Sequence, residues 1–404
     1  MWHKPWRLSE GFTISSGLVI TGLLLQYSVG AIPWQAFAWP VNVIVLVMLL
    51  AIAVVLHLLR GRFYGVRFLT TAAAAVPALT MSVAVTIVMG LTRQHTVSMP
   101  GSTWIHNMLS SWPLVLCYAW MALILCLTVL QRLRHWRWRD IPFYLNHLGL
   151  LIVLLAGTLG NADMQRLTLT ATAERPEWRA VDAGGNVHEL PLAVQLEQFT
   201  IDEYAPRLMV VGTHGGKYLP QGNPASLTLD STTTVGELLG WHIDVRAVLD
   251  KAAPMMSVDS TAYVVWPSSG ATTAAHIVAT RDTITREGWL TCGSYLFPMQ
   301  MLTLDDSLTL AMPEREPRAY VSTVHIYTRS EKNIRAHVRV NQPIDVEGWK
   351  IYQLDYNRQM GRWSDTSVLE LVRDPWLPIV YCGIAMMMIG AVALFLNLNN
   401  RKKK

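Results

Sequence analysis

Six apolar stretches of membrane-spanning length constrain this chain more than any other feature. A helix needs about 20 mostly apolar residues to cross a bilayer, and the stretches that meet this length are Ile14–Ile32, Val41–Leu59, Leu69–Leu91, Pro113–Leu130, Tyr144–Leu159 and Trp376–Leu396.

 

The loops between these stretches are short, except that about 215 residues separate the fifth stretch, Tyr144–Leu159, from the sixth. The sequence therefore predicts a six-span membrane α-helical bundle with a large domain inserted before the last helix. We expect a five-span membrane region at 1–160, an inserted domain at 161–375, and a closing helix with a basic tail at 376–404.

The composition supports a membrane protein with one polar part. Of 404 residues, 51% are hydrophobic and 15% are charged, whereas soluble domains carry about 25% charged residues. The net charge of +5 is small and comes mostly from short basic loops, so the charge indicates no nucleic-acid partner. Membrane lipid is the surrounding partner that this composition predicts.

Basic residues predict the orientation of the spans. One cluster joins the second and third stretches, another joins the fourth and fifth, and a third ends the chain: Arg60, Arg62 and Arg67; Arg132, Arg134, Arg137 and Arg139; and Arg401, Lys402, Lys403 and Lys404. All three fall on one side if every stretch spans, and positive loops stay in the cytoplasm. We expect both termini to be cytoplasmic and 161–375 to be extracytoplasmic.

The inserted region has the pattern of β-strands. Leu192–Phe199, Tyr320–Tyr327 and His337–Val340 alternate between apolar and polar residues, which is the period of a half-buried strand. Glycine pairs and Pro343 separate such stretches. We expect a β-rich domain, either a sandwich or an open barrel, tethered by a helix at each end.

Several chemistries lack their motifs in this sequence. The four cysteines form no CxxC, no CxxCH and no zinc-binding spacing with histidine. This excludes a thioredoxin-type oxidoreductase and a c-type cytochrome. There is no Gly-x-Ser-x-Gly, no P-loop and no paired-carboxylate pattern, so the sequence predicts no catalytic residue.

His147 is the main candidate for a binding residue. It follows Asn146 and precedes Leu148-Gly149-Leu150, about one turn inside the fifth apolar stretch. Ionisable residues within membrane helices tend to mark function, and a neutral imidazole is a ligand for haem iron. The alternative is a helix-end histidine that bonds to a neighbouring helix or to the interface.

Three other histidines are less favoured as haem ligands. His57 lies near the end of the second stretch, close to Arg60, where an interfacial histidine is an adequate explanation. His95 and His106 lie in the loop between the third and fourth stretches and could flank an outer haem site, although surface-loop histidines are common. The segment His135–Asp140 has tryptophan and arginine in alternation, which is typical of an interfacial anchor.

The chain resembles the ResB family, also called CcsB, in four features. These are Asn146–Leu150 before a helix leading outward, Leu192–Tyr204, the turn Val338–Pro343 followed by Gly348–Gln353, and a single closing helix with a basic tail. The resemblance covers roughly Trp112 to the C-terminus. An extra apparent hairpin at the N-terminus departs from the smallest family pattern, and it leaves His57 open as the residue matching the family's histidine.

This resemblance implies a function. The family is half of the System II cytochrome c synthase of the bacterial inner membrane. With a CcsA-type or CcsC-type membrane partner it handles haem, exports it, and presents it to the CxxCH motifs of apocytochromes c. The implied cofactor is haem b shared with the partner, with His147 as an axial ligand of the haem iron and His57 as runner-up. A holocytochrome c synthase (haem lyase) activity would belong to the complex rather than to this chain alone.

Two other functions remain open from the residues. A membrane cytochrome b-type electron-transfer subunit would supply both axial histidines itself, and His57 with His147 is the possible pair. A cofactor-free membrane assembly scaffold would bind no haem at all.

Overall fold

The computed structural model describes residues 2–94, 104–213, 215–230, 232–256 and 261–402. The chain divides into two compact units. Unit 1 consists of Met1–Gln165 with Val372–Lys404 and is helical, whereas unit 2 is Arg166–Leu371 and consists mainly of β-strands. Each unit is described by itself below.

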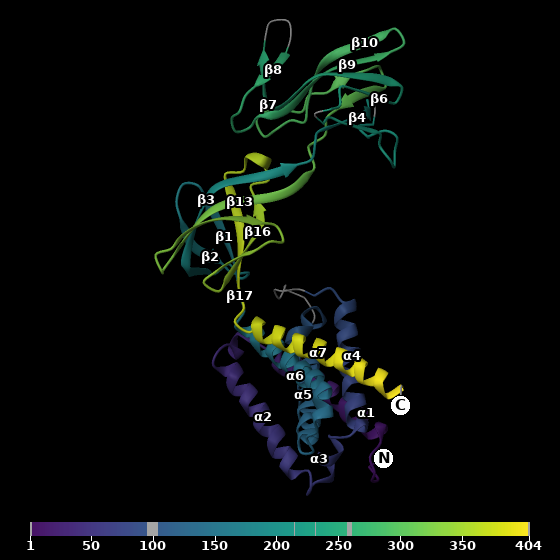
Figure 1. Cartoon of the computed structure of the whole chain (residues 1–404), viewed down its shortest axis with the longest axis vertical. Coiled ribbons are helices and arrows are strands. Elements are labelled where there is room, and N and C mark those ends of the chain that lie inside the picture. The colour runs from purple at the N-terminus through teal and green to yellow at the C-terminus, as the bar shows by residue number, and fades with distance from the viewer. Residues whose placement is uncertain (1, 95–103, 214, 231, 257–260, 403–404) are drawn as a thin grey trace. The chain divides into compact units, whose positions relative to one another are not determined.

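Unit 1 contains six long apolar helices among its described residues. Their bounds are α1 Leu8–Val29, α2 Val41–Leu59, α4 Ala72–Leu91, α5 Trp112–Leu133, α6 Ile141–Leu159 and α7 Leu377–Lys402, with the short helix α3 at Tyr64–Phe68 (Figure 1). Short 3-10 turns stand at η1 Trp34–Phe37, η2 Trp104–Ser110, η3 Trp138–Asp140 and η4 Gly160–Ala162. Six segments of the described chain are long and apolar enough to cross a membrane, so the protein is a multi-pass membrane protein.

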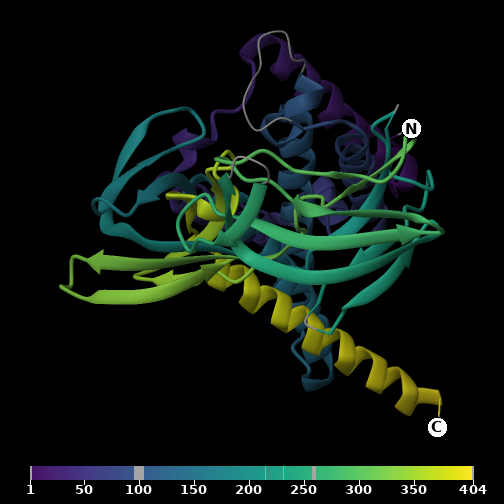
Figure 2. The same ribbon diagram turned by 90° about the horizontal axis from the view of Figure 1, so that it is seen from above.

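The helices agree with the apolar stretches, with shifts at their ends. The first helix begins at Leu8 rather than at Ile14 and includes the polar residues Ser9 and Glu10. Glu10 accepts a hydrogen bond from the backbone N–H of Arg7 at 2.8 Å, which caps the beginning of the helix. The last helix continues as one piece to the end of the described chain (Figure 2).

Glycines allow α6 and α7 to pack closely. A Cβ on Gly149 would lie 2.7 Å from the carbonyl oxygen of Gly383, and a Cβ on Gly383 would lie 2.8 Å from the carbonyl oxygen of Gly149. One on Gly390 would lie 2.5 Å from the amide nitrogen of the Asn146 side chain. Small residues at such positions let helix backbones approach in a membrane, where packing rather than water exclusion drives association.

Asp163 joins three chain segments just beyond α6. Its carboxylate accepts hydrogen bonds from the backbone N–H of Trp39 at 2.6 Å, the Asn42 side chain at 2.7 Å and the Trp376 indole at 2.7 Å. Asn42 also donates to the carbonyl oxygen of Leu159 at 3.3 Å. The beginning of α2 therefore meets the end of α6, and the two helices run antiparallel.

The described residues of unit 2 form three sheets. The first has eight strands in the order β14-β13-β3-β2-β1-β17-β16-β15. Their bounds are β1 Gln165–Thr172, β2 Glu177–Val181, β3 Val187–Glu203, β13 Pro317–Thr328, β14 Asn333–Arg339, β15 Ile344–Val346, β16 Trp349–Tyr356 and β17 Thr366–Arg373. Its buried residues form one apolar core to which all eight strands contribute, with Leu169, Val194, Ile326, Ile351 and Leu371 among those at 0% exposure.

The other two sheets share a second core. One contains β6 Val235–Leu238, β7 Trp241–Met256, β8 Thr261–Val265, β9 Thr272–Arg281 and β10 Ile284–Thr291, and the other contains β4 Arg207–Gly212, β5 Ser226–Thr228, β11 Leu302–Thr303 and β12 Leu308–Ala311. Leu208 and Leu310 from the second of these pack with Trp241, Ile277 and Leu290 from the first. The predicted fold class, six apolar helices with a β-rich domain before the last one, is confirmed.

Candidate functional site

The helix that carries His147 holds its imidazole in one tautomer. The Nδ1 atom lies 3.0 Å from the carbonyl oxygen of Phe143, one turn earlier in α6. A carbonyl oxygen only accepts hydrogen bonds, so Nδ1 carries the proton and the neutral ring keeps a lone pair on Nε2. The ring also stacks on Phe143, with 3.8 Å between the ring centroids. Nδ1–H bonded to a carbonyl is the usual arrangement of a histidine that binds a metal through Nε2.

His147 lies on the stripe of α6 that faces α2 and α5. Leu151 and Leu155 follow it at intervals of four residues, which places the three on one face of the helix. Leu151 is buried in a cluster with Ala53 of α2 and Cys126 of α5, and Leu155 packs against that cluster. The neighbouring residues Asn146 and Gly149 instead contact α7. The Asn146–Gly149 motif thus serves two surfaces of α6.

The structure brings His57 to the same end of the bundle as His147. Because α2 and α6 are antiparallel, the end of α2 lies at the end where α6 begins. His57 is one turn beyond Ala53, and His147 is one turn before Leu151, so both histidines extend the same apolar cluster in the same direction. The Nδ1 atom of His57 is buried and has no hydrogen-bond partner among the described residues. We call this end of unit 1 the histidine end.

Arg132 and several aromatic side chains lie at the histidine end. Arg132 forms an ion pair with Asp140 at 2.7 Å and lies over the ring of Phe143 at 4.6 Å from its centroid. Phe143 in turn stacks on His147. Trp136 stacks on Tyr144 with 4.8 Å between centroids. The His135–Asp140 segment therefore packs on the beginning of α6.

The two loop histidines are placed differently. His95 lies outside the described residues. His106 lies in η2, and its Nδ1 is 2.8 Å from the carbonyl oxygen of Arg93. The contact ties this short turn to the segment that follows α4, and the possible role of His106 at an outer haem site stays a prediction.

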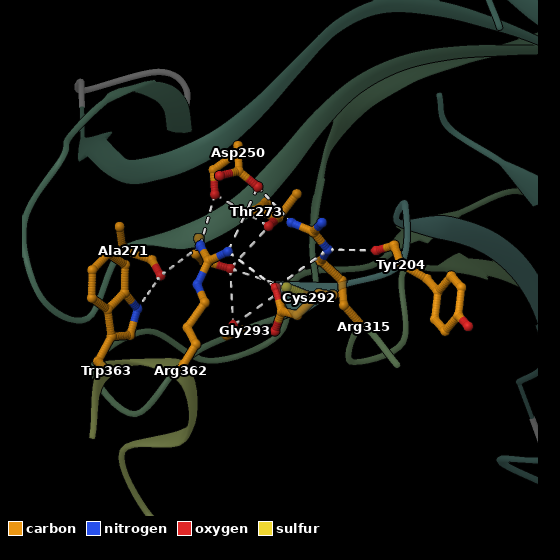
Figure 3. Close-up of polar contacts among 11 residues, drawn as sticks. Tyr204, Asp250, Ala271, Thr273, Cys292, Gly293, Arg315, Arg362 and Trp363 are labelled. Carbon is orange, nitrogen blue, oxygen red and sulfur yellow. Dashed lines mark hydrogen bonds and ion pairs between the residues drawn. The ribbon is translucent and has the colours of Figure 1, made fainter. Parts of the chain in front are cut away.

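Unit 2 contains a charged cluster that the sequence did not indicate. Glu203, Asp250, Arg315 and Arg362 meet there. Figure 3 labels the last three of them. They come from β3, β7, the connection between β12 and β13, and the turn η5 at Gly361–Trp363. No local pattern links residues so far apart, and only the pairing of distant strands brings them together.

These features define a class: a multi-pass membrane protein with a β-rich domain inserted before its last span. A model of the ResB-like family matches residues 297–364 of this chain. The matched part runs from the loop before β11 through η5, and the match confirms the predicted resemblance to the ResB family. A ResB-like protein is involved in cytochrome c biogenesis. No curated protein matches this chain.

Proposed function

We propose that this chain is the ResB-type subunit of a System II cytochrome c maturation complex. In this role it handles haem together with a CcsA-type or CcsC-type membrane partner, so that haem is exported and presented to CxxCH apocytochromes. The proposed location is the bacterial inner membrane, with both termini in the cytoplasm and unit 2 outside. Covalent attachment of haem is assigned to the complex and not to this chain alone.

The observation that carries the proposal is the state of His147. Its Nδ1–H is taken by Phe143, so the neutral ring offers Nε2, the atom that haem iron needs. The donor chemistry of His147 is compatible with haem b, in which case His147 would hold the iron and the partner would supply the other ligand. Bound haem would supply the iron that the Nε2 atom of His147 would hold.

Partner dependence tests the proposal. We expect no maturation of a reporter c-type cytochrome when this chain is expressed alone in cells that lack their own maturation system. Co-expression with a CcsA-type protein should give covalently attached haem, detected by haem staining after denaturing electrophoresis. Full maturation by this chain alone would refute the two-subunit function.

The placement of His57 favours a second candidate, a cytochrome b-type electron-transfer subunit. His57 and His147 extend one cluster from facing helices, and such a pair can hold both axial positions of one haem. In that case the purified chain alone should show a six-coordinate haem spectrum, and substitution of either histidine should abolish it. Haem bound only in the presence of the partner would rule out this candidate.

A further inference from the structure

In the charged cluster of unit 2, Asp250 differs from the other three residues in how far its side chain is exposed to solvent. The side chains of Glu203, Arg315 and Arg362 are only 13%, 14% and 17% exposed, whereas that of Asp250 is 63% exposed. Glu203 lies between the two arginines, with its Oε2 at 3.4 Å from Arg315 Nε and 3.3 Å from Arg362 Nη1. Glu203, Arg315 and Arg362 are therefore mostly buried. The Asp250 side chain is exposed and contacts them from the solvent side.

Backbone contacts hold the arginine pair, Arg315 and Arg362, in place without the Asp250 carboxylate. Arg315 Nε donates to the carbonyl oxygen of Tyr204 at 2.9 Å. Arg362 Nη2 donates to the backbone carbonyl of Asp250 at 2.7 Å. Trp363, next to Arg362, donates through its indole to the carbonyl oxygen of Ala271 at 3.0 Å (Figure 3). A guanidinium fixed in this way is preorganised to bind an oxyanion.

The Asp250 carboxylate occupies the side of the arginine pair that faces the solvent. Its Oδ1 contacts Nη1 of Arg315 and lies 3.6 Å from Nη1 of Arg362. The two arginines carry two positive charges and Glu203 carries one negative charge, so a second carboxylate completes the balance. Burial raises the pKa of Glu203, although the charges of Arg362 and Arg315 act in the opposite direction.

Two cavities adjoin this cluster. One of ≈ 370 Å³ is lined on its apolar side by Phe297, Met299 and Met360, and another of ≈ 480 Å³ is lined by Phe199 and Ile201. Glu203, Arg315, Arg362 and Trp363 line both. Both volumes fall in the range of about 300–1,000 Å³ that is typical of sites for small ligands, and both linings combine apolar side chains with polar and charged ones. The family match at 297–364 includes both arginines and Trp363.

We propose that the arginine pair binds the carboxylate of an apolar ligand, and that Asp250 occupies this place until the ligand displaces it. The ligand carboxylate then pairs with Arg315 and Arg362, its apolar body lies in an adjoining cavity, and the Asp250 carboxylate turns to water. Charge balance is the same before and after the exchange. Two sources of such a carboxylate fit the proposed function, a porphyrin propionate and a peptide carboxylate of a client protein. The choice between these sources rests on the proposed function, but the carboxylate site does not.

The test measures binding of protoporphyrin IX without iron to the full-length protein in detergent. Without iron, His147 makes no axial bond, so the result is independent of the haem-ligand proposal. We expect Asp250→Asn to bind more tightly than wild type, because the internal competitor loses its charge. We expect Arg362→Gln to bind about tenfold more weakly, the change that corresponds to about 1.4 kcal/mol. The dimethyl ester of the porphyrin, which lacks carboxylates, should not distinguish the variants.

Matched variants control for general effects of charge. Asp345 is 61% exposed and pairs with Lys350 at 3.1 Å, so Asp345→Asn removes a carboxylate of equal exposure that lines neither cavity. Arg179→Gln removes an arginine that pairs with Glu177 instead. Neither should change porphyrin affinity. If Arg362→Gln does not fold, Arg362→Lys replaces it, and Asp250→Asn remains informative because Asp250 is exposed.

A peptide arm identifies the source of the carboxylate. The probe is an acetylated tetrapeptide ending in phenylalanine, with its C-terminal amide as control. The predicted pattern is tighter binding by Asp250→Asn and weaker binding by Arg362→Gln. If the porphyrin shows this pattern, the ligand carboxylate is a propionate. If only the peptide shows it, the ligand is a client protein. The proposal is overturned if Asp250→Asn leaves the affinity for both probes unchanged or weakens it.

Discussion

At the scale of single residues, the hydrogen bond between His147 and Phe143 determines which imidazole nitrogen of His147 carries the proton. The sequence places this histidine inside an apolar helix, and that position alone makes it a candidate haem ligand. Its tautomer and the face it occupies follow from Phe143 and from the cluster around Leu151. Helical spacing could have predicted the shared stripe of His147 and Leu151, but not which helices this stripe faces.

Asp163 is a residue whose role the sequence did not suggest. Burial alone would raise the pKa of this carboxyl, but the hydrogen bonds from Trp39, Trp376 and Asn42 outweigh it and lower the pKa below its ordinary value of 3.8. Because the pKa of Asp163 is lower in the folded protein than in the unfolded chain, its carboxylate stabilises the fold at pH values above the ordinary pKa. This stabilisation is lost as the pH falls through the pKa of the folded state.

Asp163→Asn tests this linkage. At pH 7 we expect a loss of about 1–3 kcal/mol in the free energy of unfolding, because an amide replaces a carboxylate that accepts three hydrogen bonds. Thermal unfolding in detergent measures the loss, and its difference from wild type should shrink only as the pH falls below 3.8. Asp345→Asn, at an exposed site, is the control. Equal midpoints for Asp163→Asn and wild type at pH 7 would contradict the assignment.

At the scale of elements, two faces of α6 contact different helices. One face bears Asn146 and Gly149 against α7, and the other bears His147 toward α2 and α5. The apolar period of α6 could be predicted from the sequence. The partner of each face could not, because it depends on how distant helices pack.

Two alanine substitutions in α6 separate packing from helix propensity. Gly149→Ala places a Cβ 2.7 Å from the carbonyl oxygen of Gly383, whereas Gly157→Ala meets nothing within 4 Å. We expect Gly149→Ala to destabilise unit 1 by about 1–3 kcal/mol through overpacking. Gly157→Ala should be neutral or stabilising by about 0.5–1 kcal/mol. Similar unfolding midpoints for the two variants would argue against close packing of α6 on α7.

At the scale of the whole molecule, the local patterns predicted the classes of structure but not the division of the β-rich domain. Alternation predicted the strands at Leu192–Phe199 and Tyr320–Tyr327, which lie in β3 and β13. These two strands pair with each other across more than 100 residues, and no local signal specifies such a partner. The separate apolar cores of unit 2 and the charged cluster depend on such long-range pairings.

The proposed orientation can be tested with two tags. One tag replaces the exposed turn at Gly184 and Gly185 of unit 2, and the other follows the C-terminus. In spheroplasts with intact inner membranes we expect protease to remove the first tag but not the second, because basic loops stay in the cytoplasm. Cleavage of the C-terminal tag before lysis would reverse the topology.

The haem spectrum of His147 variants tests the central claim most directly. The full-length chain, co-purified with a CcsA-type partner, is compared with its His147→Gly and His57→Gly variants. We predict that His147→Gly loses haem or shows an altered absorption spectrum, and that added imidazole partly restores the signal by taking the vacated axial position. His57→Gly should keep its haem. Unchanged haem content, spectrum and reporter maturation in His147→Gly would contradict the account.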